Sequence, residues 1–427
     1  MKKTSAANPA QQTSSFGPIF IIGVLFFVFG FITWLNSVLI PYLKLACELN
    51  NFESYLVAFA FYMAYLVMAV PSALVLKKTG FKNGMALGLL VIGVGALLFI
   101  PAALTRNYAI FLVGLFVQGT GLAVLQTASN PYVTILGPIE SAARRISIMG
   151  ICNKVAGAIA PLILATVALK DADGLKHRLL TMSISEKQLE LNLLAHRVIV
   201  PYIVILIALV ILAVLVWRSS LPEIETEAEN DGAGHTQSKA TSVFQFPNLT
   251  LGVIALFLFV GVEVLAVDSV INYAGSLGIS LSTAKYFTTA TLAGMIAGYI
   301  VGIFCIPKVF SQAAGLKVSA IIGVIFSFGV LMTHGFTSVL FVSLLGIANA
   351  LMWPAIWPLA IDGLGKFIKI GSSLLIMSIS GGALIPLLYG RLSDVFSPQQ
   401  AYWILLPCYI FIGWYAAWGY KIKAKTT

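Results

Sequence analysis

Long apolar stretches without any charge are the feature that most constrains what this chain can fold into. The first runs from Thr4 to Leu43 and contains no charged residue. A helix needs about 20 apolar residues to cross a bilayer, so this run alone is long enough. Of the 427 residues, 59% are hydrophobic and only 10% are charged, whereas soluble domains average about a quarter charged residues. Because a spanning helix satisfies its own backbone hydrogen bonds in lipid, we predict an all-α membrane protein.

Short blocks of charge divide the chain into twelve segments of spanning length. The first apolar run is too long for the core of a secretory signal, so we interpret it as a permanent span. The predicted spans cover approximately 18–42, 54–76, 84–104, 108–131, 146–169, 198–218, 249–274, 286–306, 316–335, 338–361, 370–392 and 401–420.

Lysine and arginine are shared unequally between the two sets of loops. With the N-terminus placed in the cytoplasm, the inner segments hold sixteen of these residues, and the short outer loops hold only Lys44, Arg106, Lys285 and Arg391. This asymmetry is typical of a multi-pass protein of the cell (inner) membrane with both termini in the cytoplasm. The net charge of +10 therefore reflects membrane orientation, and we expect lipid rather than nucleic acid as a partner.

A polar, acidic segment from Ser219 to Pro247 separates six spans from six. We predict a bundle at 1–218, a solvated cytoplasmic linker at 219–247 and a second bundle at 248–427. The halves resemble each other weakly, since Gly157 to Pro161 (GAIAP) recurs as Gly382 to Pro386 (GALIP). Duplicated halves with a central site fit transporters that work by alternating access.

Uncharged polar side chains and tryptophans inside the spans are the candidate substrate contacts. Gln126 and Asn130 are four residues apart and share a helix face in a span that we expect to break at Pro131. Amides donate and accept hydrogen bonds, and indole faces suit the flat C–H surface of a sugar ring. The alternative is that the amides only hold helices together and that the tryptophans anchor them at the interface. The candidates are Trp34, Asn36, Gln126, Asn130, Asn153, Asn272, Asn349, Trp353 and Trp357.

Three charged residues lie well inside predicted spans, namely Lys154, Glu263 and Asp268. Burial favours the neutral form of a carboxyl group, which would let it carry a proton, and a carboxylate could equally bind sodium. We expect Asp268 to share a face with Asn272 and to couple a cation, with Glu263 or Lys154 as an accessory. The alternatives are a structural Asp268–Lys154 ion pair and simple exposure of Asp268 to solvent.

Several motifs resemble one family. Phe31 to Pro41 (FITWLNSVLIP) and Leu125 to Pro138 (LQTASNPYVTILGP) look like the fucose–galactose–glucose cation-symporter family of the major facilitator superfamily. The basic loop KKTGFKNG after Pro71 is similar to the loop between the second and third spans of that superfamily. The resemblance implies the major facilitator fold with two pseudosymmetric six-helix bundles, and hexose uptake coupled to protons or sodium.

The chain departs from the fucose–proton symporter of that family at three places. It has Ser37 where the symporter has Asp, Gln126 where it has Glu, and Gly150 where it has Gln. Gln126 resembles the glucose/galactose branch instead, whereas Asn36, Asn130 and Asn153 fit both branches. The family's usual membrane acids are therefore missing, and the resemblance does not carry over their role in proton coupling.

We therefore predict a monomeric importer of a neutral hexose, with glucose or galactose preferred and a sodium ion or proton co-transported. Within the same class, an N-acetylated amino sugar or fucose is the alternative. A membrane sugar sensor that does not transport and a drug-efflux transporter remain alternatives from other classes. An enzyme is disfavoured, because the four histidines and four cysteines form no metal spacing and no nucleophile motif or phosphate loop occurs. We expect no metal centre and no cofactor.

Overall fold

The computed structural model describes residues 16–135, 142–219, 221, 242–306, 309, 311–364 and 367–422. Within these ranges every regular element is an α-helix or a short 3-10 helix. Twelve of the helical segments are long and apolar enough to cross a membrane, which confirms the predicted number of spans. Most of the predicted linker lies outside the described residues, so the domain boundaries stay a prediction.

The first six spans and the segments that connect them contain nine helices. They are α1 (Phe16–Trp34), α2 (Asn36–Ala46), α3 (Asn51–Thr79), α4 (Phe81–Thr105), α5 (Tyr108–Ile135), α6 (Ala142–Ala168), α7 (Ala172–Arg178), α8 (Ile184–His196) and α9 (Ile199–Arg218). Spans two to six correspond to α3, α4, α5, α6 and α9, while α1 and α2 together form the first span. The short helices α7 and α8 lie between the fifth and sixth spans.

The last six spans contain more interruptions. The elements are η2 (Val243–Gln245), α10 (Pro247–Asp268), α11 (Val270–Ser276), α12 (Leu281–Cys305), α13 (Gln312–Met332), α14 (Gly335–Asn349), α15 (Met352–Ile361), α16 (Ile368–Met377), η4 (Ser378–Ser380), α17 (Gly381–Val395), η5 (Gln400–Ile404), α18 (Leu405–Ala417) and η6 (Gly419–Lys421). Here α10 and α11 cover the predicted seventh span, α14 with α15 forms the tenth, and α16 with α17 forms the eleventh.

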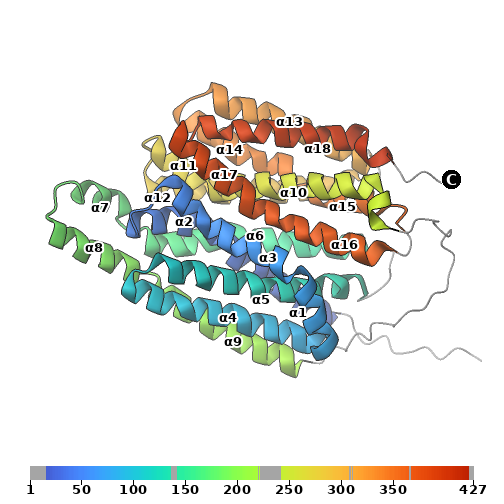
Figure 1. Ribbon diagram of the computed structural model, residues 1–427, viewed down its shortest axis with the longest axis horizontal. Helices are drawn as coiled ribbons and strands as arrows, with labels where there is room; N and C mark the ends of the chain where they lie inside the picture. The colour runs from blue at the N-terminus through green and yellow to red at the C-terminus, as the bar shows by residue number, and fades with distance from the viewer. Residues whose placement is uncertain are drawn as a thin grey trace, which may run out of the picture.

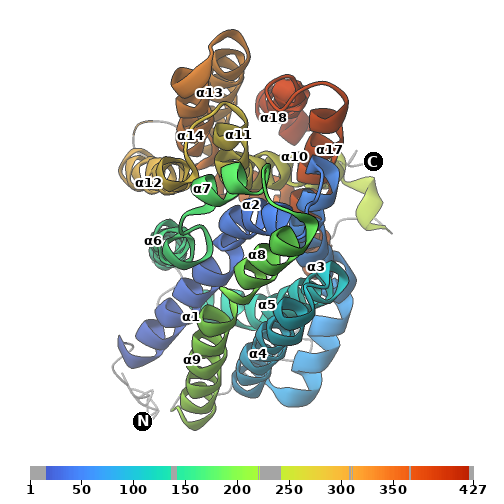
Figure 2. The ribbon, with the colours of Figure 1, turned by 90° about the vertical axis from the view of Figure 1, so that its left-hand side faces the viewer.

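The helices run along the long axis of the molecule in two bundles (Figure 1). One bundle packs α1 on α6 and α4 on α5 and α9, and the other packs α10 on α15 and α17 and α13 on α18. The N-terminal bundle meets the C-terminal bundle chiefly where α3 packs on α17 and where α6 packs on α12. The end that carries α2, α7, α8 and α11 faces the viewer in Figure 2, and we call it the α7 face. The start of α1 and the 3-10 helix η6 lie at the opposite end.

The first and seventh spans, which are equivalent in the two halves, are both interrupted. The first breaks at Leu35 between α1 and α2, and the seventh breaks at Ser269 between α10 and α11. Interrupted helices in transporters place unpaired backbone groups and polar side chains at membrane depth, where they line binding sites. The residues beside these two breaks include Trp34, Asn36 and Asp268.

The predicted break at Pro131 is wrong, because α5 runs through this residue to Ile135. Proline removes one backbone donor, which leaves a carbonyl one turn earlier without its helical partner. In the preceding turns, hydroxyl groups bond back to the helix: Thr127 Oγ1 donates to the Ala123 carbonyl at 2.7 Å and Ser129 Oγ to the Leu125 carbonyl at 2.8 Å. Side chains of this kind and neighbouring helices commonly support proline within membrane helices.

An exposed apolar stripe follows the outer side of α9. Its members recur every three or four residues and are each more than half exposed: Val200, Val204, Ile207, Ile211 and Leu215. Such a continuous apolar face is stable in lipid rather than water. The stripe therefore agrees with the assignment of α9 to the membrane.

Candidate functional site

Four of the predicted site residues meet at the seam between the bundles. Trp34 Nε1 donates to Asn153 Oδ1 at 3.4 Å, and the Lys154 ammonium lies 4.4 Å from the centroid of the Trp34 ring. The same ammonium lies 2.8 Å from Glu263 Oε1, on α10 of the other bundle. The cluster thus connects the break in the first span to the seventh span through α6.

Two glycines allow this close arrangement. A Cβ atom at Gly157 would overlap the Trp34 ring, and a Cβ atom at Gly30 would overlap the backbone of Asn153. Because neither glycine carries a side chain, α1 and α6 approach closely and hold Trp34 and Asn153 side by side. Small residues at helix crossings serve the same purpose in membrane bundles generally.

The ion pair between Lys154 and Glu263 corrects one alternative from the sequence. The Lys154 ammonium pairs with Glu263 and not with Asp268. The side chains of Lys154 and Glu263 are only 8% and 11% exposed. A charge buried to this degree is costly unless it is paired, so each of the two residues stabilises the charged form of the other.

Asp268 is fully buried, which excludes exposure of this residue to solvent. Neither carboxyl oxygen has a hydrogen-bond partner within the described part of the chain. Tyr55 and Tyr62 of α3 lie within electrostatic range of the group. Asp268 is also the last residue of α10, where the negative end of the helix dipole disfavours a negative charge. An unpaired carboxyl group in this position is stable when it is neutral or when a bound cation offsets its charge.

The shared face of Asp268 and Asn272 stays a prediction. The break at Ser269 separates the two residues onto α10 and α11. Asn272 Nδ2 donates to Asn51 Oδ1 at 3.4 Å, and Lys44 Nζ donates to Asn272 Oδ1 at 3.5 Å. These contacts place Asn272 at the α7 face, between the two bundles.

The amides of the N-terminal bundle differ in their partners. The half-buried Gln126 donates from Nε2 to the hydroxyl of Tyr65 at 2.8 Å. Asn36 is 1% exposed, and neither atom of its amide has a partner among the described residues. The backbone of Asn130 belongs to α5, but its side chain lies outside the described residues. The partner Tyr65 was missed from the sequence, although Tyr55, Tyr62 and Tyr65 recur at the 3.6-residue period of one helix face.

In the C-terminal bundle, Asn349 and the two candidate tryptophans have different partners. Asn349 ends α14, is 1% exposed and accepts a hydrogen bond from Tyr409 at 2.8 Å. The rings of Trp353 and Trp357 are both half-buried on α15 and stack with centroids 5.6 Å apart. Asn349 therefore contacts α18 within its own bundle, whereas the two indoles form a separate aromatic pair.

Together these residues offer uncharged hydrogen-bonding groups and aromatic faces between two bundles. Amides can both donate to and accept from the hydroxyl groups of a ligand. Among the described residues, no group of three or more His, Cys, Asp or Glu side chains could hold a metal ion. The amides, indoles and ion pair described above are suited to hydrogen bonding, ring stacking and charge pairing.

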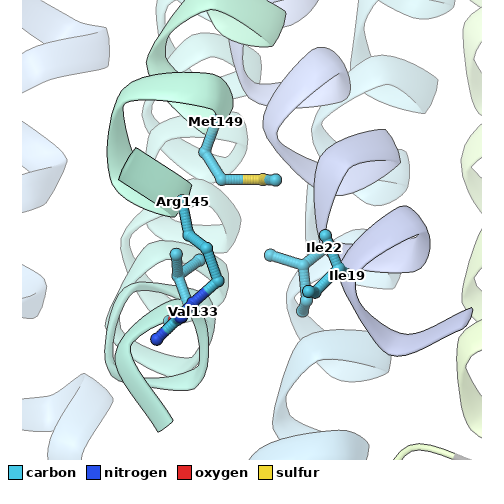
Figure 3. A pocket seen from close by; sticks show the side chains of 5 residues that line it. All are labelled: Ile19, Ile22, Val133, Arg145 and Met149. Atoms are coloured by element: carbon cyan, nitrogen blue, oxygen red, sulfur yellow. The ribbon is translucent and has the colours of Figure 1, made fainter. Parts of the chain in front are cut away.

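Figure 3 shows a small crevice between α1, α5 and α6, apart from these residues. It is lined by Ile19, Ile22, Val133, Arg145 and Met149. Arg145 Nε donates to the Val133 carbonyl at 2.8 Å, and the other lining side chains are apolar. The crevice contains none of the predicted site residues, and its lining offers little to a hydroxylated ligand.

The chain is similar over most of its length to known proteins. The family model described as Major Facilitator Superfamily matches residues 22–375. A glucose/galactose transporter of Brucella abortus is 33% identical over 401 residues, which cover 93% of each chain. The L-fucose-proton symporter of Escherichia coli is 29% identical over 395 residues, which cover 91% of this chain and 89% of that protein.

A solved structure supports the same assignment. The crystal structure of the Escherichia coli fucose:proton symporter matches with a TM-score of 0.71 at 27% identity. The match covers 95% of this chain and 98% of that one. The predicted fold, with two pseudosymmetric six-helix bundles, is confirmed. The chain belongs to the major facilitator superfamily, in the branch that holds the fucose and the glucose/galactose transporters.

Proposed function

We propose that this protein imports a neutral hexose by alternating access, with uptake driven by a sodium or proton gradient. The observation that carries the proposal is the uncharged character of the available contacts at the seam. The two charges nearest to Trp34 and Asn153 neutralise each other in the Lys154–Glu263 pair. What remains for a ligand is a set of amides and indoles, which suits hydroxyl groups and sugar rings.

Glucose or galactose is the substrate that we favour. Relatives over almost the whole chain are named glucose/galactose transporters, and Gln126 supplies an amide where the fucose symporter of the family carries an acid. L-fucose is the second candidate, because the L-fucose-proton symporter of Escherichia coli is 29% identical. An N-acetylated amino sugar stays in the panel of sugars to be tested.

Asp268 is the group that we propose for cation coupling. Its carboxyl group is buried and unpartnered in the described part of the chain, whereas Glu263 is held by Lys154. A proton or a sodium ion would relieve the cost of burying this charge, and its release would make the site unfavourable again. The cation should therefore bind most tightly in the conformations in which protein surrounds Asp268 and the break at Ser269.

The orientation that we propose places both chain termini in the cytoplasm. The excess of lysine and arginine on that side supports it, and the α7 face then lies outside. A sugar entering from the α7 face would be released at the opposite end of the bundles. We propose the bacterial inner membrane as the location and a monomer as the working unit.

Counterflow of radiolabelled glucose in proteoliposomes tests the transport proposal. Vesicles preloaded with unlabelled sugar should accumulate label transiently, because a carrier exchanges substrate without any cation gradient. Galactose, fucose and N-acetylglucosamine then compete in the same assay, and their order identifies the preferred sugar. Absence of counterflow for every sugar in the panel, with binding retained, would favour a sensor and contradict the proposal.

Gln126→Leu is expected to weaken sugar recognition about fivefold, since one hydrogen bond to a substrate hydroxyl is worth roughly 1 kcal/mol. The measurement is the KM for glucose counterflow. Gln188→Leu is the matched control, because Gln188 lies exposed on α8 and contacts Arg106. A variant that loses thermal stability with an unchanged KM would assign Gln126 to helix packing against Tyr65 instead.

A further inference from the structure

Two aspartates bind helix N-termini of the opposite bundle at the α7 face. Asp394, near the end of α17, accepts hydrogen bonds from the first two backbone amides of α3. Its Oδ1 is 3.0 Å from Asn51 N and its Oδ2 is 2.8 Å from Phe52 N. The first amides of a helix have no partner within the helix, and its positive end attracts a carboxylate. A residue of the C-terminal bundle thus satisfies the first backbone amides of a helix in the N-terminal bundle.

Asp173, on α7 of the N-terminal bundle, makes the reciprocal contact. Its Oδ1 and Oδ2 lie 3.0 Å and 2.9 Å from the backbone nitrogen of Leu281. Leu281 is the first residue of α12 in the C-terminal bundle. Each bundle therefore supplies one aspartate to a helix N-terminus of the other bundle.

The two receiving helices are capped in the same way. Asn50 caps α3 by accepting from the Glu53 amide at 2.7 Å, and Ser280 caps α12 by accepting from the Thr283 amide at 3.3 Å. Each helix thus satisfies its third amide with its own cap, and its first amide bonds an aspartate of the other bundle. Because α3 and α12 are the second and eighth spans, they are equivalent in the two halves.

A cluster of polar side chains connects the same elements between these contacts. Asn51 offers its amide hydrogen to Asp394 and its side-chain oxygen to Lys44 and Asn272. Lys44 belongs to α2 and Asn272 to α11, the short helices that follow the breaks in the first and seventh spans. Figure 2 shows α2, α7 and α11 together on this face, close to the seam.

We propose that Asp173 and Asp394 form a symmetric pair of latches that hold the α7 face closed during the transport cycle. Opening this face separates α3 from α17 and α12 from α7, so both latches must exchange their backbone partners for water. They are positioning residues, since neither belongs to the candidate sugar contacts. The kinetic consequences rest on the proposed transport function, whereas the closed geometry can be measured without any substrate.

The test is the distance between two spin labels on opposite bundles. Cysteines introduced at the exposed positions Leu189 on α8 and Thr337 on α14, after replacement of the four native cysteines, carry the labels. In the full chain in lipid nanodiscs, Asp173→Asn combined with Asp394→Asn should raise the ratio of long to short distances about tenfold or more. Each asparagine removes the charge, and at position 394 it leaves only one acceptor for two amide donors.

Two substitutions on the same face serve as controls. Asp171→Asn removes a carboxylate that pairs with Arg178, and Glu48→Gln removes one that pairs with Lys187, both within the N-terminal bundle. Both should leave the distance distribution of the parent protein unchanged. An unchanged distribution in the folded double variant, or an equal shift in the controls, would overturn the proposal. If the double variant does not fold, each single variant should give a smaller shift in the same direction, and no shift in either would overturn it.

Transport assays on the same variants separate this proposal from the function. Weakened latches should change the turnover of counterflow more than its KM, because the sugar contacts are untouched. A shift in distances together with no counterflow in the parent protein would leave the latches standing and remove the transport proposal. Normal counterflow in the parent protein, with no shift in the spin-label distances of the double variant, would support the transport proposal and overturn the latches.

Discussion

Lys154→Met is expected to destabilise the protein by about 3–5 kcal/mol. The substitution leaves the Glu263 carboxylate 11% exposed and without its partner 2.8 Å away. It also removes the cation that lies 4.4 Å from the Trp34 ring centroid. The measurement is the free energy of unfolding in detergent, followed by denaturant or heat.

A double variant distinguishes pairing from packing. Lys154→Met combined with Glu263→Leu should recover most of the lost stability, because no buried charge is then left alone. Lys187→Met is the control for an exposed ion pair on the α7 face, and it should change stability by about 1 kcal/mol or less. If Lys154→Met has the same free energy of unfolding as the parent protein, the pairing of Lys154 with Glu263 does not stabilise the fold, which would contradict this prediction.

Asp268→Asn is expected to abolish accumulation of sugar against its gradient while preserving exchange. Asparagine keeps the size of the side chain but can neither release a proton nor offset a bound cation. Sugar contacts are left in place, so the two bundles can still alternate around the substrate. The measurement compares counterflow with gradient-driven uptake in one preparation of proteoliposomes.

The stability of the same variant adds an independent check. Removal of an unpartnered buried carboxyl group should leave the protein as stable as the parent or more stable. Asp171→Asn is the control for loss of a carboxylate elsewhere and should retain both counterflow and accumulation. Retained accumulation in Asp268→Asn would mean that another group couples the cation.

The number and rough extent of the spans could be predicted because they depend only on hydrophobicity along the chain. The seventh span illustrates the limit of this reasoning. Its helix ends at Asp268, six residues before the predicted end, and the chain continues as α11 after the break at Ser269. Hydrophobicity does not change at this break, so the pattern carried no signal for it.

The candidate site could be predicted only in part. The residue types were informative, since the three charges found inside predicted spans are all buried. Their pairing was not predictable, because it depends on how α6 of one bundle is rotated toward α10 of the other. From the sequence alone, Lys154 could have paired with either Glu263 or Asp268. Contacts between backbone and side chain, such as those of Asp173 and Asp394, have no sequence periodicity and appear only with the packed bundles.

Gradient-driven uptake of radiolabelled glucose in proteoliposomes tests the central claim most directly. The sugar is placed at equal concentration on both sides, and an inward gradient of protons or of sodium is imposed. The account predicts that glucose or galactose rises inside above its outside concentration with one of the two gradients, and that Asp268→Asn removes this rise. Uptake that only equilibrates, whichever gradient is imposed, would contradict coupled hexose import.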